Sequence, residues 1–124
     1  MKQRRDSSSQ VAVNLPELLV RLDNDHDLLC ELIGIFKEEF PRLMQSLQQS
    51  VAREDMKNVE AMSHALKGML SGLSVTQAAA AASRLEQRAR EGEKLGLTNA
   101  LTLLENEVAD LLPELDGYTE EAKP

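Results

Sequence analysis

One apolar stripe within residues 25–52 constrains the fold of this chain more than any other feature. Its members follow one another at steps of 4, 3, 4, 3 and 4 residues, which places them on one side of a single long helix. They are Leu29, Ile33, Phe36, Phe40, Leu43 and Leu47. Pro41 lies inside the stripe, so we expect a kink near residues 37–41 and not a break.

Two further helices flank this one in the sequence. "LPELLVRL", at 15–22, follows Asn14, which is a good N-cap residue, and predicts one short helix. Asp55 is a second N-cap candidate, and it precedes a helix that reaches about Leu73. The apolar residues of this helix again form one stripe, with Leu66 at its centre.

The C-terminal half predicts two more long helices. The first begins at Ser74, where Gln77 three residues later fits a capping box, and it stops at Gly92. Its alanine run predicts a close contact between helices. The second covers 97–115, and Pro113 in its last turn should shorten or bend it.

These segments predict an all-α fold. Four amphipathic helices joined by short links form an antiparallel four-helix bundle, here with a short additional N-terminal helix. No stretch alternates apolar and polar residues over a useful length, so strands are not predicted. We expect a flexible polar leader at 1–13, the bundle domain at 14–116 and a flexible tail at 117–124.

Composition and charge exclude several classes of function. Hydrophobic residues make up 42% of the chain and charged residues 28%, as in folded soluble domains. The net charge of −7 disfavours nucleic acid and anionic membranes as partners. The chain shows neither a secretory signal nor an apolar run of the ~20 residues that span a bilayer. Cys30, the single cysteine, fits a reducing compartment, so we expect the protein in the cytoplasm. We also expect it to be a monomer.

His64 lies in the predicted helix at 56–73 but outside its apolar stripe. A helix turns by about 100° per residue, so His64 is about 160° from Leu66 and should face solvent. The residues that share this face are Lys57, Glu60, Ala61, Lys67, Gly68 and Ser71. From position alone, the alternative is a surface histidine without a function.

The neighbours of His64 favour a chemical role. Gly68, one turn further, costs about 1 kcal/mol relative to alanine in a helix, and clearance beside the imidazole is the simplest reason for it. Lys67 adds a positive charge, and Ser71 adds a hydroxyl. Imidazole is largely uncharged near pH 7 and can act as a nucleophile. Phosphoryl transfer suits this arrangement, because positioning and charge stabilisation supply most of its catalysis.

The chain offers no site for a nucleotide or a metal. It has no Gly-rich phosphate loop, and no histidines and carboxylates stand at metal-ligand spacing. We therefore predict a phosphocarrier that is not an enzyme by itself, has no cofactor of its own and relies on a partner for Mg²⁺.

The residues around His64 resemble a known family. "SHALKG" at 63–68 is similar to the H-x-x-K-G core of histidine-containing phosphotransfer (HPt) domains of two-component phosphorelays. Upstream, "FKEEFP" matches the family's F-x-x-E-x-P, and downstream "AASRLEQRAREG" at 81–92 resembles its L-E-x-x-x-R-x-G segment. The resemblance covers roughly residues 14–115.

This resemblance implies a role for each residue of the face. His64 would be phosphorylated on the ring nitrogen farther from the backbone, Lys67 would stabilise the phosphoryl group, and Gly68 would leave room for it. The partner would be a response-regulator receiver domain that supplies Mg²⁺ and exchanges phosphoryl groups between its aspartate and His64. We expect this domain to dock on the solvent face that includes Lys57, Glu60 and Ala61, together with an adjacent face of the preceding helix.

The sequence departs from the family pattern at two positions. Many members have a small residue directly after the glycine and another glycine ten residues after the histidine, where this chain has Met69 and Ser74. Met69 is about 60° from the stripe centre, so we expect it in the core. Ser74 requires either a turn without a left-handed residue or some strain, and its capping role predicts an altered turn.

Other interpretations remain open at the level of sequence. The chain could be a helical interaction module whose histidine is incidental, a histidine kinase fragment, or the HPt module of a larger hybrid sensor histidine kinase. His26 is expected to be a solvated surface residue, and Cys30 a half-buried packing residue.

Overall fold

The computed structural model describes residues 13–122, with side chains as far as residue 117. This part of the chain is helical and contains no strand, which confirms the all-α prediction. Its helices are α1 (Leu15–Arg21), α2 (His26–Arg53), α3 (Met56–Gly72), α4 (Thr76–Arg90), α5 (Leu97–Val108) and α6 (Leu111–Ala122). None of the described helices combines the length and the apolarity that a membrane crossing needs.

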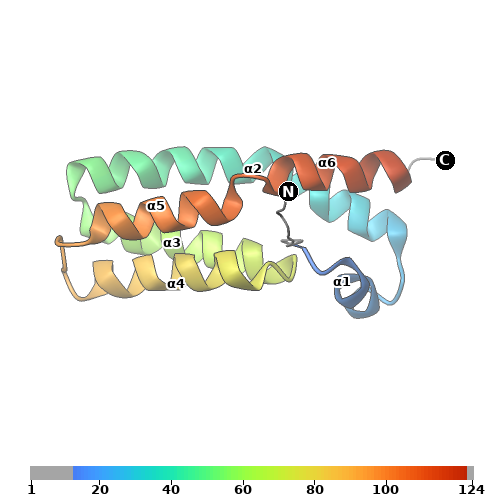
Figure 1. The fold of residues 1–124 in the computed structure, drawn as a ribbon, viewed down its shortest axis with the longest axis horizontal. Helices are drawn as coiled ribbons and strands as arrows, with labels where there is room; N and C mark the ends of the chain where they lie inside the picture. Colours follow the sequence, from blue (N-terminus) through green and yellow to red (C-terminus); the bar gives the residue numbers. More distant parts are fainter. Residues whose placement is uncertain (1–12, 123–124) are drawn as a thin grey trace, which may run out of the picture.

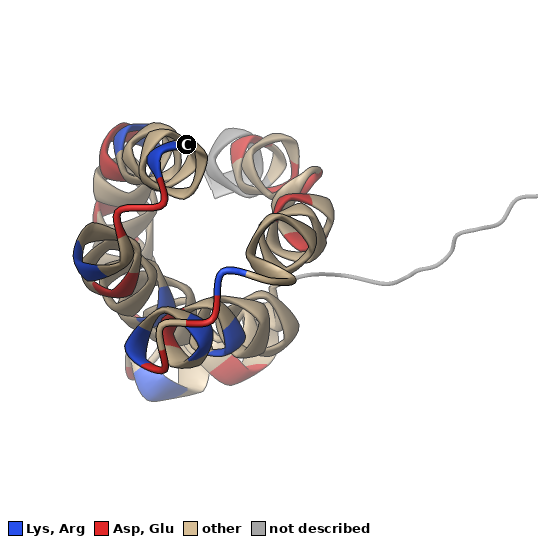
Figure 2. Cartoon of the chain, turned by 90° about the vertical axis from the view of Figure 1, so that its left-hand side faces the viewer, with Lys and Arg blue, Asp and Glu red and all other residues tan. Residues whose placement is uncertain are grey.

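Helices α2 to α5 form the bundle, and each packs against the next one along the chain. Figure 1 shows them running alternately in opposite directions, while α6 continues from α5 beside the N-terminal part of α2. Viewed end-on, the helices surround a common axis, and charged residues colour their outer parts (Figure 2). The core between them is built from leucine, alanine, valine and a few larger residues, among them stacked Phe36 and Phe40.

The predicted helix starts are confirmed at two N-caps. The Asn14 side chain accepts a hydrogen bond from the Glu17 N–H at 3.2 Å, and Asp55 accepts one from the Asn58 N–H at 3.2 Å. Pro41 does not interrupt α2, which continues through it as expected. The N-terminal part of α2 slopes away from the rest of the helix (Figure 1), as a missing backbone hydrogen bond permits.

The expected single helix over 97–115 is wrong, because the chain breaks at residues 109–110. Pro113 explains the break: inside a continuous helix its ring would crowd the carbonyl of Ala109, and its nitrogen could not donate to it. As the third residue of α6 it lies in a first turn, where no donor is needed.

The ends of the chain also differ from expectation. Helix α6 extends to Ala122, so most of the segment expected to be a flexible tail is helical. Residues 1–12 of the expected leader lie outside the described residues, but Val13 is buried and its N–H donates to Glu114 Oε2 at 3.2 Å. Val13 therefore belongs to the packed domain.

The turn between α3 and α4 corrects the predicted capping box. Helix α4 begins at Thr76 without any side-chain cap, and Ser74 adopts the left-handed conformation with φ of 61°. The Val75 N–H donates to the Leu70 carbonyl at 2.9 Å, and the Ser74 N–H donates to the Ser71 carbonyl at 3.0 Å, which is the pattern of a Schellman motif. Ser74 thus takes the backbone conformation that glycine adopts most easily, and the turn itself is ordinary.

Arg21 of α1 compensates for the serine at this turn. Its Nη1 donates to Ser74 Oγ at 2.6 Å and to the Ser71 carbonyl at 3.3 Å. Ser74 is only 4% exposed, so its hydroxyl needs such a partner. These two hydrogen bonds connect the short helix α1 to the C-terminal end of α3.

Substitutions of Ser74 should separate the hydrogen bond from the backbone strain. Ser74→Ala keeps the left-handed strain and loses the bond from Arg21, so we expect the free energy of unfolding to fall by about 1–2 kcal/mol. Ser74→Gly loses the same bond but removes a strain of roughly 1–2 kcal/mol, so its stability should stay near that of the wild type. Urea unfolding measures both, and a glycine variant no more stable than the alanine variant would contradict the strain argument.

Candidate functional site

His64 lies in the middle of α3 with its side chain 68% exposed, in agreement with its angular position. Its Nδ1 is 2.9 Å from Oε2 of Glu86, a residue of α4. The other ring nitrogen, Nε2, makes no hydrogen bond to any described residue. The histidine is therefore held at one nitrogen and open to solvent at the other.

Glu86 is the buried centre of the site, with only 5% of its side chain exposed. Its Oε1 is 2.7 Å from Lys67 Nζ, and its Oε2 accepts a hydrogen bond from Arg90 Nη2 at 2.8 Å in addition to the His64 contact. The hydrogen bond from Lys67 is the main cause that holds the pKa of Glu86 below its usual value, against the opposing effect of burial. The carboxylate is therefore ionised at neutral pH.

An ionised Glu86 determines how the His64 ring is protonated. A carboxylate can only accept hydrogen bonds, so Nδ1 must carry the proton that lies between them. In the neutral ring, Nε2 then keeps its lone pair and points to solvent. In this arrangement Nε2 is the ring nitrogen whose lone pair is not held by a described residue.

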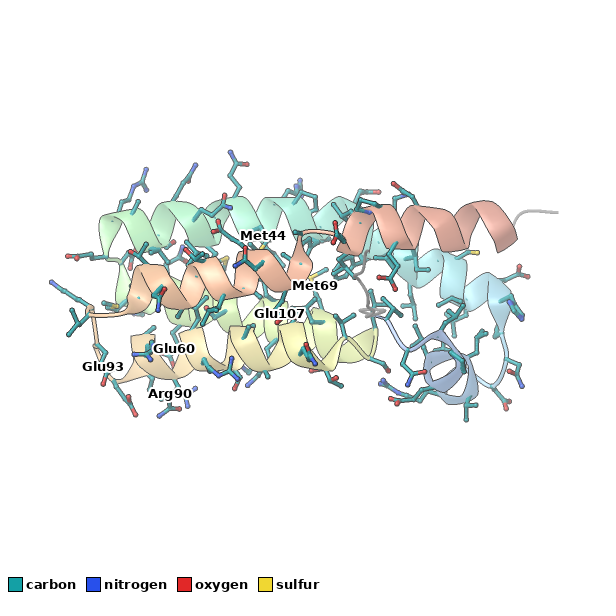
Figure 3. The ribbon with its side chains drawn as sticks, viewed as in Figure 1. Met44, Glu60, Met69, Arg90, Glu93 and Glu107 are labelled. Carbon is teal, nitrogen blue, oxygen red and sulfur yellow. The ribbon has the colours of Figure 1, made fainter. Side chains whose placement is uncertain are left out.

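Arg90 links this centre to Glu60. Its Nε donates to Glu60 Oε2 at 3.0 Å, and Figure 3 shows the two side chains near the α4–α5 end of the bundle. The pKa of Arg90 is raised, first of all by its hydrogen bond to Glu60. The predicted docking residue Glu60 is thus already engaged in an ion pair.

An open depression of about 520 Å³ lies beside His64 between α3 and α4. It is lined by Lys57, Glu60, Ala61, His64, Glu86 and Arg90. The three predicted docking residues therefore share one hollow with His64.

Gly68 and Ser71 lie further along the same face of α3. A Cβ atom added at Gly68 would meet nothing within 4 Å, so the fold itself does not require glycine there. Ser71 is two turns from His64 and makes no side-chain hydrogen bond to it; its backbone carbonyl accepts from Arg21 instead. A contact of Ser71 with the phosphoryl group stays a prediction.

A second, apolar groove lies between α2 and α3. Its volume is about 250 Å³, and its lining consists of Leu32, Ile35, Phe36, Met69, Gly72 and Leu73. Ile35 is 56% exposed, which is unusual for an isoleucine on a packed helix. Met69 packs against the core, as expected, and also lines this groove.

From the sequence, His64 and Lys67 were expected at the site, whereas Glu86 and Arg90 stood only as the Glu and Arg of the segment that resembles L-E-x-x-x-R-x-G, without a role. Glu86 follows Ala82 by four residues and so lies beside the apolar stripe of α4, where a carboxylate is out of place. A glutamate at such a position, with an arginine four residues later on the same helix face, indicates a buried ion pair. Among the residues that the structure describes, no group of three or more His, Cys, Asp or Glu could hold a metal ion.

The family model for the Hpt domain matches residues 31–114, which is more than half of the chain and includes every residue of the site. No curated protein and no solved structure matches the chain.

Proposed function

This chain belongs to the Hpt domain family, and from that premise we propose that it accepts a phosphoryl group on His64 from a receiver-domain aspartate and passes it to another receiver. Members of this family are phosphocarriers of phosphorelays, with receiver domains as their partners. One observation carries the assignment to this residue: His64 Nδ1 lies 2.9 Å from a buried, ionised carboxylate, while Nε2 has no partner among the described residues and 68% of the side chain is exposed.

The proposed transfer step uses that geometry. The lone pair of Nε2 attacks the phosphorus of the aspartyl phosphate, an N–P bond forms, and the P–O bond to the aspartate breaks with its electron pair left on the carboxylate. Nδ1 keeps its proton, so the ring gains a positive charge that Glu86 stabilises. Reversal of the same step, on a second receiver, returns the group to an aspartate.

Lys67 supplies the second charge that the phosphoryl group needs. Its ammonium lies 2.7 Å from Oε1 of Glu86, the same carboxylate that contacts His64 through Oε2, and 34% of its side chain is exposed. A flexible lysine stem can carry this charge from the carboxylate to a phosphoryl oxygen. We assign the required Mg²⁺ to the receiver domain, so the carrier contributes its histidine and its lysine.

The receiver domain is proposed to dock across α2 and α3. Approach to Nε2 brings it over the depression that contains Lys57, Glu60 and Ala61. On the other flank of α3, the apolar groove with the exposed Ile35 offers surface that a partner could bury. A charged rim around an apolar area is the usual composition of a transient interface.

A phosphotransfer assay tests the function directly. The chain is incubated with a receiver domain that carries labelled aspartyl phosphate, and we expect a label that is stable in alkali and labile in acid. With labelled ATP alone the chain should stay unlabelled. Labelling by ATP would favour a kinase fragment, and no labelling in either arm would leave only an interaction module.

Gly68→Ala should separate stability from function. Alanine is preferred in a helix interior by about 1 kcal/mol, and nothing in the fold opposes its Cβ, so the variant should unfold at higher denaturant concentration. A methyl group beside the phosphoryl position should nevertheless slow transfer by roughly tenfold or more, because small displacements in a reacting geometry are costly.

Gly34→Ala is the matched control for this substitution. Gly34 is also an exposed glycine inside a helix, and no atom lies within 4 Å of an added Cβ. It should gain similar stability and keep the wild-type transfer rate. Equal rates for both variants would show that Gly68 does not provide clearance.

A further inference from the structure

The transfer described above does not use Arg90, although its guanidinium bridges two carboxylates beside His64. Nη2 donates to Glu86 Oε2 at 2.8 Å, and Nε donates to Glu60 Oε2 at 3.0 Å. Glu60 belongs to α3 and Glu86 to α4, so Arg90 ties together the two helices that form the depression (Figure 3). A guanidinium suits this task because its five N–H donors have a fixed planar geometry.

Arg90 and His64 share one oxygen of Glu86. Oε2 receives the His64 Nδ1 contact at 2.9 Å and the Arg90 bond, whereas Oε1 faces Lys67. Burial raises the free energy of an ionised carboxylate unless its oxygens have partners. Each oxygen of Glu86 has a cationic partner on a different side.

Phosphorylation of His64 would change which cations contact the two oxygens of Glu86. A phosphoryl group on Nε2 brings between one and two negative charges next to Lys67. As Lys67 turns toward the phosphoryl oxygens, Oε1 of Glu86 loses its partner, while Nδ1 of the ring becomes more positive. Arg90 remains on Oε2, because Glu60 holds it from the other side.

We propose that Arg90 is a positioning residue, which keeps Glu86 Oε2 directed at His64 Nδ1 so that Nε2 stays the nucleophile. This inference rests on the proposed role of His64. The orientation of the ring, however, is a property of the unphosphorylated protein and can be measured without any transfer.

Nitrogen-15 NMR of the His64 ring tests the proposal in the full chain. In the wild type, the tautomer with the proton on Nδ1 should dominate whenever the ring is neutral. In Arg90→Ala, the population of the tautomer with the proton on Nε2 should rise measurably, and transfer from a phosphorylated receiver should slow by about threefold to tenfold. Arg90→Lys should lie between the wild type and Arg90→Ala in both the tautomer population and the transfer rate. Lysine returns the positive charge but cannot make both hydrogen bonds of the guanidinium.

Arg88→Ala is the matched control. It removes an arginine of the same helix together with its ion pair to Glu93 at 3.0 Å, and it should leave the His64 ring and the transfer rate unchanged. If Arg90→Ala does not fold, Glu60→Gln weakens the second anchor of the guanidinium and should shift the tautomers in the same direction. The proposal is overturned if the His64 ring shifts of both Arg90→Ala and Glu60→Gln equal those of the wild type. It is also overturned if Arg88→Ala changes the ring shifts and the transfer rate as much as Arg90→Ala does. A wild-type chain that takes no label would overturn the function instead, while the ring shifts would still decide the role of Arg90.

Discussion

His64→Gln is expected to abolish the acid-labile label that a phosphorylated receiver domain transfers to the wild-type chain. Glutamine is similar in size and polarity, but it lacks a ring nitrogen with a free lone pair, so no N–P bond can form. His64 is 68% exposed, and its only described partner is Glu86, so the variant should fold with little change in stability. Helical circular dichroism confirms the fold, and the label on the gel gives the result.

His26→Gln is the control for this substitution. His26 is the only other histidine, it is exposed, and it stands in the first turn of α2. We expect this variant to take up label at the wild-type rate. A label that persists in His64→Gln and disappears in His26→Gln would move the site to the N-terminal end of α2.

Glu86→Gln should have the next largest effect. It keeps the shape of the side chain but removes the charge on which His64, Lys67 and Arg90 converge. We expect the rate of transfer to fall by roughly tenfold to a hundredfold, which is the range seen when the partner that orients a metal-binding histidine is removed. Because two cations lose a buried partner, the free energy of unfolding should also fall by about 1–3 kcal/mol.

The same variant should alter the response to acid. The pKa of Glu86 in the folded protein lies below the ordinary 4.5, chiefly through the hydrogen bond from Lys67. A lowered carboxylate pKa adds stability above the unfolded value, and this contribution is lost as the pH falls through the folded value. Between pH 7 and the acid range, the wild type should therefore lose more stability than Glu86→Gln.

Glu107→Gln provides the comparison for both measurements. Glu107 is exposed on α5 and has no hydrogen bond or ion pair with a described residue (Figure 3). Its substitution should change neither the transfer rate nor the slope of stability with pH. If the two glutamate variants behave alike in acid, the buried cluster does not control that slope.

Much of the bundle could be predicted from periodicity, because every long helix buries one stripe. Leu66 and its stripe neighbours Val59 and Leu70 are buried where the spacing placed them, and Met62 and Met69 are partly buried. In α4 the alanines of the inner face, Ala78, Ala82 and Ala89, are buried, whereas Ala80 is exposed. The errors occurred at turns. The side chain of Ser74 predicts a helix cap, but the backbone pattern at the end of α3 and a distant partner, Arg21, decide its conformation. Pro113 predicts a shortened or bent last turn, although a proline can equally lie in the first turn of a new helix.

Only those site residues that lie on a single helix, α3, could be assigned a role from the sequence. His64 and Lys67 share a face of α3, and angular position is sufficient to find them. Glu86 comes from α4, and its approach to His64 depends on the rotation of one helix against the other. A carboxylate beside an apolar stripe indicates that a buried partner exists, but it does not identify that partner.

All the charged groups that meet at His64 come from residues 60–90, within the single helical hairpin of α3 and α4. Their contacts are therefore short in sequence separation, and assembling the centre needs only one tight loop closure. Low contact order favours fast folding. We expect the hairpin to form early and to carry the reactive centre with it, while the more distant pairing of α6 with α2 completes the domain later. Changes at either end of the chain should then alter stability more than chemistry.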